Sequence, residues 1–217
     1  MEMRRGEFEH TTSHWWWRPG WGPETRYLTF HLTFGSEPAL AVPADRYAGV
    51  LGGLGRVDRV PPSWLHLTMT GVGHAAEVPD EALHALCSRV LDDAAGRADG
   101  QSAIVFDTLY LGRDGLSLTG QVPDWLTALR HAQESAVEDL LGGPREWRRV
   151  PPHVTLAYFD GEIDEVALVW GLNDAGLEDV VITRPTLSLI ELRRQGHLYS
   201  WRTIAERQLT LVPVDRP

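Results

Sequence analysis

The stretch VPPSWLHLTM, from Val60 to Met69, returns in shortened form as VPPHVTL, from Val150 to Leu156. Each copy places a His-x-Thr triplet in an apolar stretch directly after a Pro-Pro pair, and the chain contains no other Pro-Pro pair. Because a proline disfavours helical geometry in the residue before it, both copies are expected to begin in an extended conformation. The repeat predicts two β-strands with the same polar pattern.

The triplet alone carries little information, because the chain has four, at 10–12, 31–33, 66–68 and 153–155. The shared context distinguishes the last two. Side chains alternate along a strand, so His66 and Thr68 point to the same side, as do His153 and Thr155. If the two strands meet, one imidazole takes a proton while the other gives one, and the hydroxyls hold phosphoryl oxygens. This arrangement suits phosphodiester cleavage without a metal.

His-Leu-Thr-Met and His-Val-Thr-Leu, about ninety residues apart, resemble the two motifs of the two-histidine (2H) phosphoesterase superfamily, and more narrowly of 2'-5' RNA ligase-like proteins. The resemblance implies two α+β lobes related by a pseudo-twofold, with one motif from each lobe in a central cleft. It implies a phosphodiesterase or ligase-like enzyme acting on a 2'-5' linkage or a 2',3'-cyclic phosphate of a small nucleotide or RNA terminus. It also implies His66 and His153 as acid and base, and Thr68 and Thr155 as phosphate donors.

The order of predicted strands and helices along the rest of the chain favours the same α+β class, with mainly antiparallel sheets flanked by helices. A Trp-rich irregular arm is expected over 1–25, followed by a single bilobed domain over 26–217. Strands are expected at 26–34, 63–72, 102–111, 115–122, 153–160 and 180–183, with a final hairpin that turns at 195–196. Helices are expected at 44–51, 79–96, 124–141 and 162–172.

Composition limits the class of protein. With 43% hydrophobic and 23% charged residues, the chain is expected to fold as a globular domain. The single cysteine excludes an intrachain disulfide or a cysteine-rich zinc site and favours a reducing compartment. The absence of a long apolar run or signal peptide predicts a cytoplasmic protein that does not associate with a membrane. The net charge of −10 disfavours wrapping of long nucleic acid. The oligomeric state stays open.

Four further residues are candidates for substrate contact. His31 lies on the polar face of the strand at 26–34, which is either a wall of the cleft or a solvated face. Arg149, directly before the second motif, is placed to meet a phosphate or a base, or belongs to a solvated loop. Tyr199 and Trp201 share one face of the last hairpin and either support a nucleobase or pack in the core.

Three alternatives stand beside the catalytic interpretation. A histidine in a strand is often a buried residue satisfied by its neighbours. His31, His66 and His153 could instead form a zinc site, although neither an HExxH motif nor a cysteine pair supports one, and no metal or cofactor is expected. A non-catalytic module could also use the same cleft to bind a nucleotide or another phosphorylated ligand.

Overall fold

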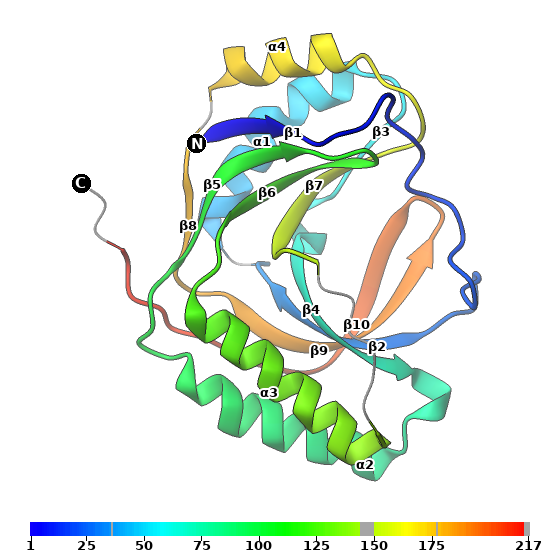
Figure 1. The fold of residues 1–217 in the computed structure, drawn as a ribbon, viewed down its shortest axis with the longest axis vertical. Coiled ribbons are helices and arrows are strands. Elements are labelled where there is room, and N and C mark those ends of the chain that lie inside the picture. Colours follow the sequence, from blue (N-terminus) through cyan, green and yellow to red (C-terminus); the bar gives the residue numbers. More distant parts are fainter. Residues whose placement is uncertain (36, 144–149, 177, 215–217) are drawn as a thin grey trace.

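The computed structural model describes residues 1–35, 37–143, 150–176 and 178–214, and most of these form one mixed sheet with flanking helices (Figure 1). The strands are β1 (Glu2–Arg5), β2 (Tyr27–Thr33), β3 (Val57–Arg59), β4 (His66–His74), β5 (Ile104–Leu111), β6 (Gly115–Gln121), β7 (His153–Phe159), β8 (Val180–Ile182), β9 (Thr186–Gln195) and β10 (Leu198–Gln208). The main helices are α1 (Pro38–Gly53), α2 (Asp80–Leu86), α3 (Asp124–Leu141) and α4 (Glu165–Ala175). The expected α+β class is confirmed.

The sheet consists of two half-sheets in the order β1-β5-β6-β7 and β4-β2-β9-β10. Within each half, β7-β6-β5 and β4-β2-β9 pair antiparallel in the same succession. Between the halves, β4 and β7 share only one registered pair, Leu67 with Val154. The internal repeat of the sequence therefore corresponds to a repeat of strands, and the two motif strands meet at the seam.

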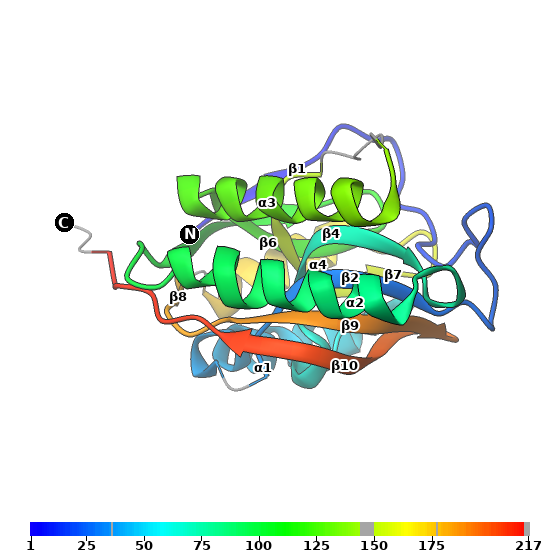
Figure 2. The ribbon, with the colours of Figure 1, turned by 90° about the horizontal axis from the view of Figure 1, so that it is seen from below.

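Helices cover the outer sides of both half-sheets. In Figure 1, α1 and α4 lie together beyond β5, β6 and β7, while α2 and α3 lie at the opposite end, next to β4 and β10. Figure 2 shows α2 and α3 running side by side along one flank. Buried aliphatic and aromatic side chains from both half-sheets and from the helices form one continuous core, with Phe30, Leu67, Phe106 and Phe159 among the most buried.

Several boundaries differ from the sequence prediction. The predicted helix at 44–51 starts earlier, at Pro38, and includes Pro43. The predicted helix at 79–96 is α only to Leu86 and continues as a π-helix over Cys87–Ala94. Helix α4 begins after Asp164, whose carboxylate accepts a hydrogen bond from the Ala167 N–H at 2.9 Å. Helix α3 agrees with the prediction at both ends.

The first 25 residues are more ordered than the predicted irregular arm. Strand β1 pairs in parallel with β5 at an edge of the sheet. Farther along, Thr11 and Trp15 are buried, and the His14 N–H bonds the Phe159 carbonyl at the end of β7. The segment that follows β1 therefore runs along the second motif strand and reaches the side of the candidate site.

Candidate active site

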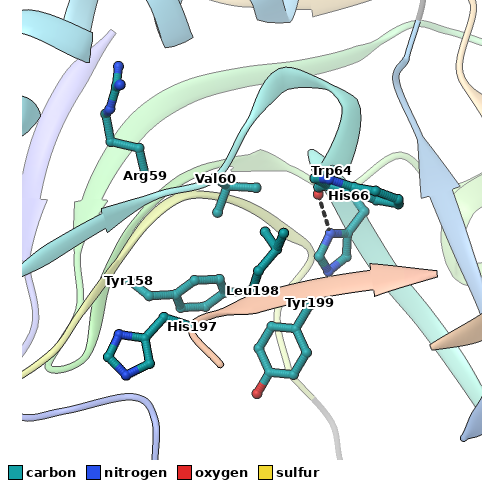
Figure 3. Close-up of a pocket in the computed structure, with 8 residues that line it drawn as sticks. All are labelled: Arg59, Val60, Trp64, His66, Tyr158, His197, Leu198 and Tyr199. Atoms are coloured by element: carbon teal, nitrogen blue, oxygen red, sulfur yellow. Dashed lines mark hydrogen bonds between the residues drawn. The ribbon is translucent and has the colours of Figure 1, made fainter. Parts of the chain in front are cut away.

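The first motif begins where the Pro61-Pro62 pair ends. Pro62–Trp64 form a single 3-10 turn, and His66 is the first residue of β4. The Nδ1–H of His66 donates a hydrogen bond to the Trp64 carbonyl oxygen at 2.8 Å (Figure 3). A carbonyl only accepts, so the proton of the neutral ring sits on Nδ1. The Nε2 atom is left with a lone pair and can act as a base.

The second motif repeats this arrangement. His153 is the first residue of β7, and its Nδ1–H donates to the Pro151 carbonyl oxygen at 2.9 Å. In both motifs the acceptor therefore lies two residues before the histidine. In the second motif the acceptor belongs to the Pro-Pro pair itself, whereas in the first it belongs to Trp64, at the end of the 3-10 turn that begins at the second proline of the pair.

The pairing of β4 with β7 brings the two triplets onto one face. The paired residues Leu67 and Val154 are the middle residues of the two triplets, and both are fully buried. Paired residues of antiparallel strands point to the same side, and their chain neighbours point to the other. The flanking residues His66 and Thr68, and His153 and Thr155, therefore lie together on the face opposite to the core.

An aromatic cluster holds the His66 ring. His31 of β2 stacks on it with ring centroids 4.5 Å apart and an interplanar angle of 4°. Trp201 of β10 meets it edge-on at 5.3 Å, and Trp64 meets Trp201 edge-on at 4.7 Å. Burial is the main cause that lowers the pKa of His66 to about 4, and the charge of His153 acts in the same direction. His66 is therefore neutral at pH 7.

His31 lies beneath this cluster. Its side chain is 1% exposed, and its Nδ1 is buried without a hydrogen-bond partner. Burial, followed by the proximity of His66, lowers its pKa well below the ordinary value. The structure thus places His31 against His66 and 5.9 Å from the Trp201 ring, behind the two residues rather than on the open surface.

Thr155 belongs to a second hydrogen-bonded group. Its Oγ1 accepts from the Ser117 hydroxyl of β6 at 3.3 Å, and its side chain also bonds Tyr158. Register shifts follow both motif threonines, so that Leu116 pairs with Ala157 after the Ser117–Thr155 pair. This bulge returns Tyr158 to the side of Thr155. Burial raises the pKa of Tyr158, which stays protonated.

Arg130 of α3 joins the two motifs. Its Nη2 donates to the Thr68 carbonyl oxygen at 3.2 Å and its Nη1 to the Val150 carbonyl oxygen at 3.3 Å. One planar guanidinium therefore spans the first triplet and the backbone just before the second. Sequence reasoning missed this residue, because an arginine in the middle of an amphipathic helix carries no local signal of such a role.

The segment after β1 forms a wall beside the site. His14 donates from Nδ1 to Asp114 Oδ2 at 2.8 Å and accepts at Nε2 from the Tyr199 hydroxyl at 3.2 Å. The hydrogen bond from His14 holds the pKa of Asp114 below its ordinary value. Trp15 stacks on His197 at 5.0 Å. Sequence reasoning assigned no role to His14, because its partners lie at least 100 residues away.

The tyrosines of β7 and β10 close this end of the site. The rings of Tyr158 and Tyr199 lie 5.7 Å apart, which places the predicted contact residue Tyr199 beside the second motif. A cavity of about 10 Å³, the size of one water molecule, lies between them and the first motif (Figure 3). Its lining comprises Arg59, Val60, Trp64, His66, Tyr158, His197, Leu198 and Tyr199. The predicted contact residue Arg149 lies outside the described residues.

Among the described residues, no group of three or more histidines, cysteines or carboxylates is arranged to hold a metal ion. The alternative zinc set of His31, His66 and His153 is unsuited to one, since the first two rings are stacked in parallel with their centroids 4.5 Å apart and do not point toward a common centre. Likewise, no helix in the described ranges is long and apolar enough to cross a membrane.

Comparison with solved structures identifies the fold. Escherichia coli LigT in its apo form superposes with a TM-score of 0.54 at 18% identity, covering 86% of this chain and 99% of LigT. TT0787 of Thermus thermophilus superposes with a TM-score of 0.55 at 16% identity, covering 84% and 97% of the two chains. A structure described as a phosphoesterase gives 0.53 at 18% identity and covers 86% and 99%.

The chain therefore has the fold of LigT and of this phosphoesterase, and the fold expected from the 2H resemblance is confirmed. LigT has also been solved in complex with 3'-AMP and with NADP+, with TM-scores of 0.53 and 0.52 to this chain. No protein-family model matches the sequence, and no curated protein matches it.

Proposed function

We propose that this protein is a metal-independent phosphodiesterase or ligase-like enzyme that acts on a 2'-5' linkage or a 2',3'-cyclic phosphate of a small nucleotide or RNA terminus. The observation that carries the proposal is the pair of histidines that begin neighbouring strands, each with Nδ1 bonded to the carbonyl two residues earlier. Both Nε2 atoms are thereby left for proton transfer, and a threonine lies two residues after each histidine.

In hydrolysis, the neutral His66 is the base and His153 is the acid. Nε2 of His66 takes the proton of the attacking water while the oxygen forms a bond to phosphorus. Nε2–H of His153 gives its proton to the leaving oxygen as the P–O bond breaks. Thr68 and Thr155 donate hydrogen bonds to the non-bridging oxygens. The buried aromatic surroundings of His66 support its role as the base, since they keep the ring neutral at pH 7.

The complexes of LigT with 3'-AMP and NADP+ support a nucleotide as the ligand of this fold. The open position of Thr68 and the partial exposure of His153 support access of such a ligand to the face that carries the motifs. Trp201 packs against the His66 ring and Tyr199 against the Tyr158 ring, and an aromatic side chain next to a motif can also pack against a nucleobase.

The decisive experiment incubates the protein with 2'-5' dinucleotides and 2',3'-cyclic nucleotides in the presence of a chelator and follows the products by chromatography. We expect turnover that the chelator leaves unchanged and that His66→Ala lowers by about 10² to 10⁴. Binding of the same compounds without turnover would indicate the alternative function, a nucleotide-binding module. Activity that disappears with the chelator and returns with zinc would contradict the two-histidine mechanism.

A further inference from the structure

A buried guanidinium without a counter-charge lies near the end of β9. Arg194 is 8% exposed, and its Nη1 donates to the Trp16 carbonyl oxygen at 3.0 Å. The Trp17 ring covers it, with 3.4 Å between the guanidinium carbon and the ring centroid. Its Nε has no hydrogen-bond partner, and no carboxylate of the described residues pairs with it. A buried cation in this state favours the approach of an anion.

A second guanidinium lies on the neighbouring segment. Arg18 is exposed and makes no ion pair within the part of the chain that the structure describes. Arg194 is opposite Tyr199 in the β9–β10 hairpin, and the two side chains are hydrogen-bonded. The charges of Arg18 and Arg194 both act on the Tyr199 hydroxyl, where they oppose the rise in pKa that burial causes. Arg18 directly follows Trp16 and Trp17, the two residues that contact the Arg194 guanidinium, so the two cations lie on neighbouring parts of the chain.

This cluster adjoins the candidate active site. The Tyr199 ring lies 5.7 Å from the Tyr158 ring, and Tyr158 bonds the motif residue Thr155. Figure 3 shows the Tyr199 hydroxyl directed away from His66, so the cluster lies on the far side of the two rings. The nearby carboxylate of Asp114 is already bonded to His14. The charge of Arg18 also lowers the pKa of Asp114, so this one carboxylate offsets part of the positive charge, and the buried Nε of Arg194 is the group left without a partner.

We propose that Arg18, Arg194 and Tyr199 form a second phosphate site beside the candidate active site, which takes the second phosphate of a ligand whose first phosphate is held by Thr68 and Thr155. The identity of that first phosphate rests on the proposed function. The ligand class is a nucleotide with two separate phosphates, such as a nucleoside bisphosphate or a 5'-phosphorylated 2'-5' dinucleotide. Arginine is suited to this site because its planar fork matches the oxygens of a phosphate.

Calorimetric titration with adenosine 3'-monophosphate and adenosine 3',5'-bisphosphate tests this site without any need for turnover. We expect the native protein to prefer the bisphosphate by about tenfold, the contribution of one charge-assisted hydrogen-bonded contact. Arg18→Gln should reduce the preference to less than about threefold and leave monophosphate affinity unchanged. The matched control is Arg97→Gln, another exposed arginine without an ion pair in the described structure, which should keep the full preference.

Equal loss of both ligands in Arg18→Gln, or equal affinity of the native protein for both, would overturn the second site. Arg194→Lys keeps the charge and is expected to retain part of the preference, whereas Arg194→Met should lose it; circular dichroism verifies that each variant folds. Because the readout is a ratio of affinities, a protein that prefers the bisphosphate but never turns over would refute the proposed function and leave the second site standing. A protein that turns over its substrate but shows no preference for the bisphosphate would support the proposed function and refute the second site.

Discussion

His66 and His153 begin their strands in the same way, yet their rings have different neighbours. The ring of His66 packs against His31 and Trp201, and Trp201 packs in turn against Trp64. The His153 ring is partly exposed, and no aromatic contact to it occurs among the described residues. Repeated backbone geometry therefore presents two equivalent nitrogens, and burial lowers the pKa of the His66 ring. A reaction that needs one base and one acid requires the base to be neutral.

The largest expected effect comes from deleting either ring. His66→Ala and His153→Ala each remove one proton-transfer partner and should lower kcat by about 10² to 10⁴. The double variant should lose less than the product of the two effects, because the pair acts as a unit. Steady-state kinetics on a cleavable 2'-5' dinucleotide measures all three. Full turnover by His66→Ala would show that His66 is not the general base.

Substitution of Thr155 and of Thr68 by alanine should reduce kcat by different amounts, because the two side chains have different surroundings. Thr155 accepts from Ser117 and bonds Tyr158, so its hydroxyl is oriented, whereas Thr68 is exposed. Thr155→Ala should approach the loss of about 10² to 10³ in kcat known for one stabilising donor, and Thr68→Ala should cost less. Thr127→Ala, on the exposed side of α3, is the control. Equal losses at the two positions would show that orientation by β6 contributes nothing.

The low pKa of His66 also predicts a stability change with pH. Between pH 6.5 and about 4, the unfolded chain binds a proton at His66 that the folded protein does not. The free energy of unfolding therefore falls as the pH drops through this window, by up to about 3 kcal/mol at its lower end. Buried His31 acts in the same direction. Urea unfolding at pH 7 and pH 4.5 should show a smaller fall in His66→Gln than in the native protein.

The control for this comparison is His131→Gln, an exposed histidine on α3, which should retain the native fall. A fall of equal size in His66→Gln and in the native protein would mean that His66 titrates alike in both states. The packing around the His66 ring would then have no effect on its pKa, and the assignment of His66 as the base would lose its electrostatic support.

What could be predicted from the sequence was encoded locally. The two triplets and their Pro-Pro pairs need only neighbouring residues to define a strand and a face, whereas the carbonyl acceptors of the Nδ1 atoms appear only in the structure. Helix α3 was predicted at both ends because Pro123 and Gly142-Gly143 punctuate it. The polar face of β2 was visible in its alternation, although its placement beneath His66 was not.

The remaining features depend on distant partners. Strand β1 has no apolar alternation and exists because β5 offers an open edge. Strand β3, only three residues long, forms by pairing with β7. The link from His14 to Asp114 and Tyr199 joins three segments that no local pattern connects. Such contacts leave no periodic trace in the sequence, so only the folded chain reveals that the tryptophan-rich segment forms a wall of the site.

The smallest expected effect tests how the two motifs are held together. Only one registered pair joins β4 to β7, and Arg130 adds two hydrogen bonds, to the Thr68 and Val150 carbonyl oxygens, that connect the first triplet to the backbone before the second. Arg130→Lys keeps the charge but has no planar fork to reach both oxygens. We expect a loss of about 1 kcal/mol in the free energy of unfolding and a loss of up to about tenfold in kcat. Arg97→Lys, on an exposed turn, should change neither quantity. Arg130→Lys could instead leave kcat at the native value while the free energy of unfolding falls. The two hydrogen bonds of Arg130 would then stabilise the fold only, and the strands alone would align His66 with His153.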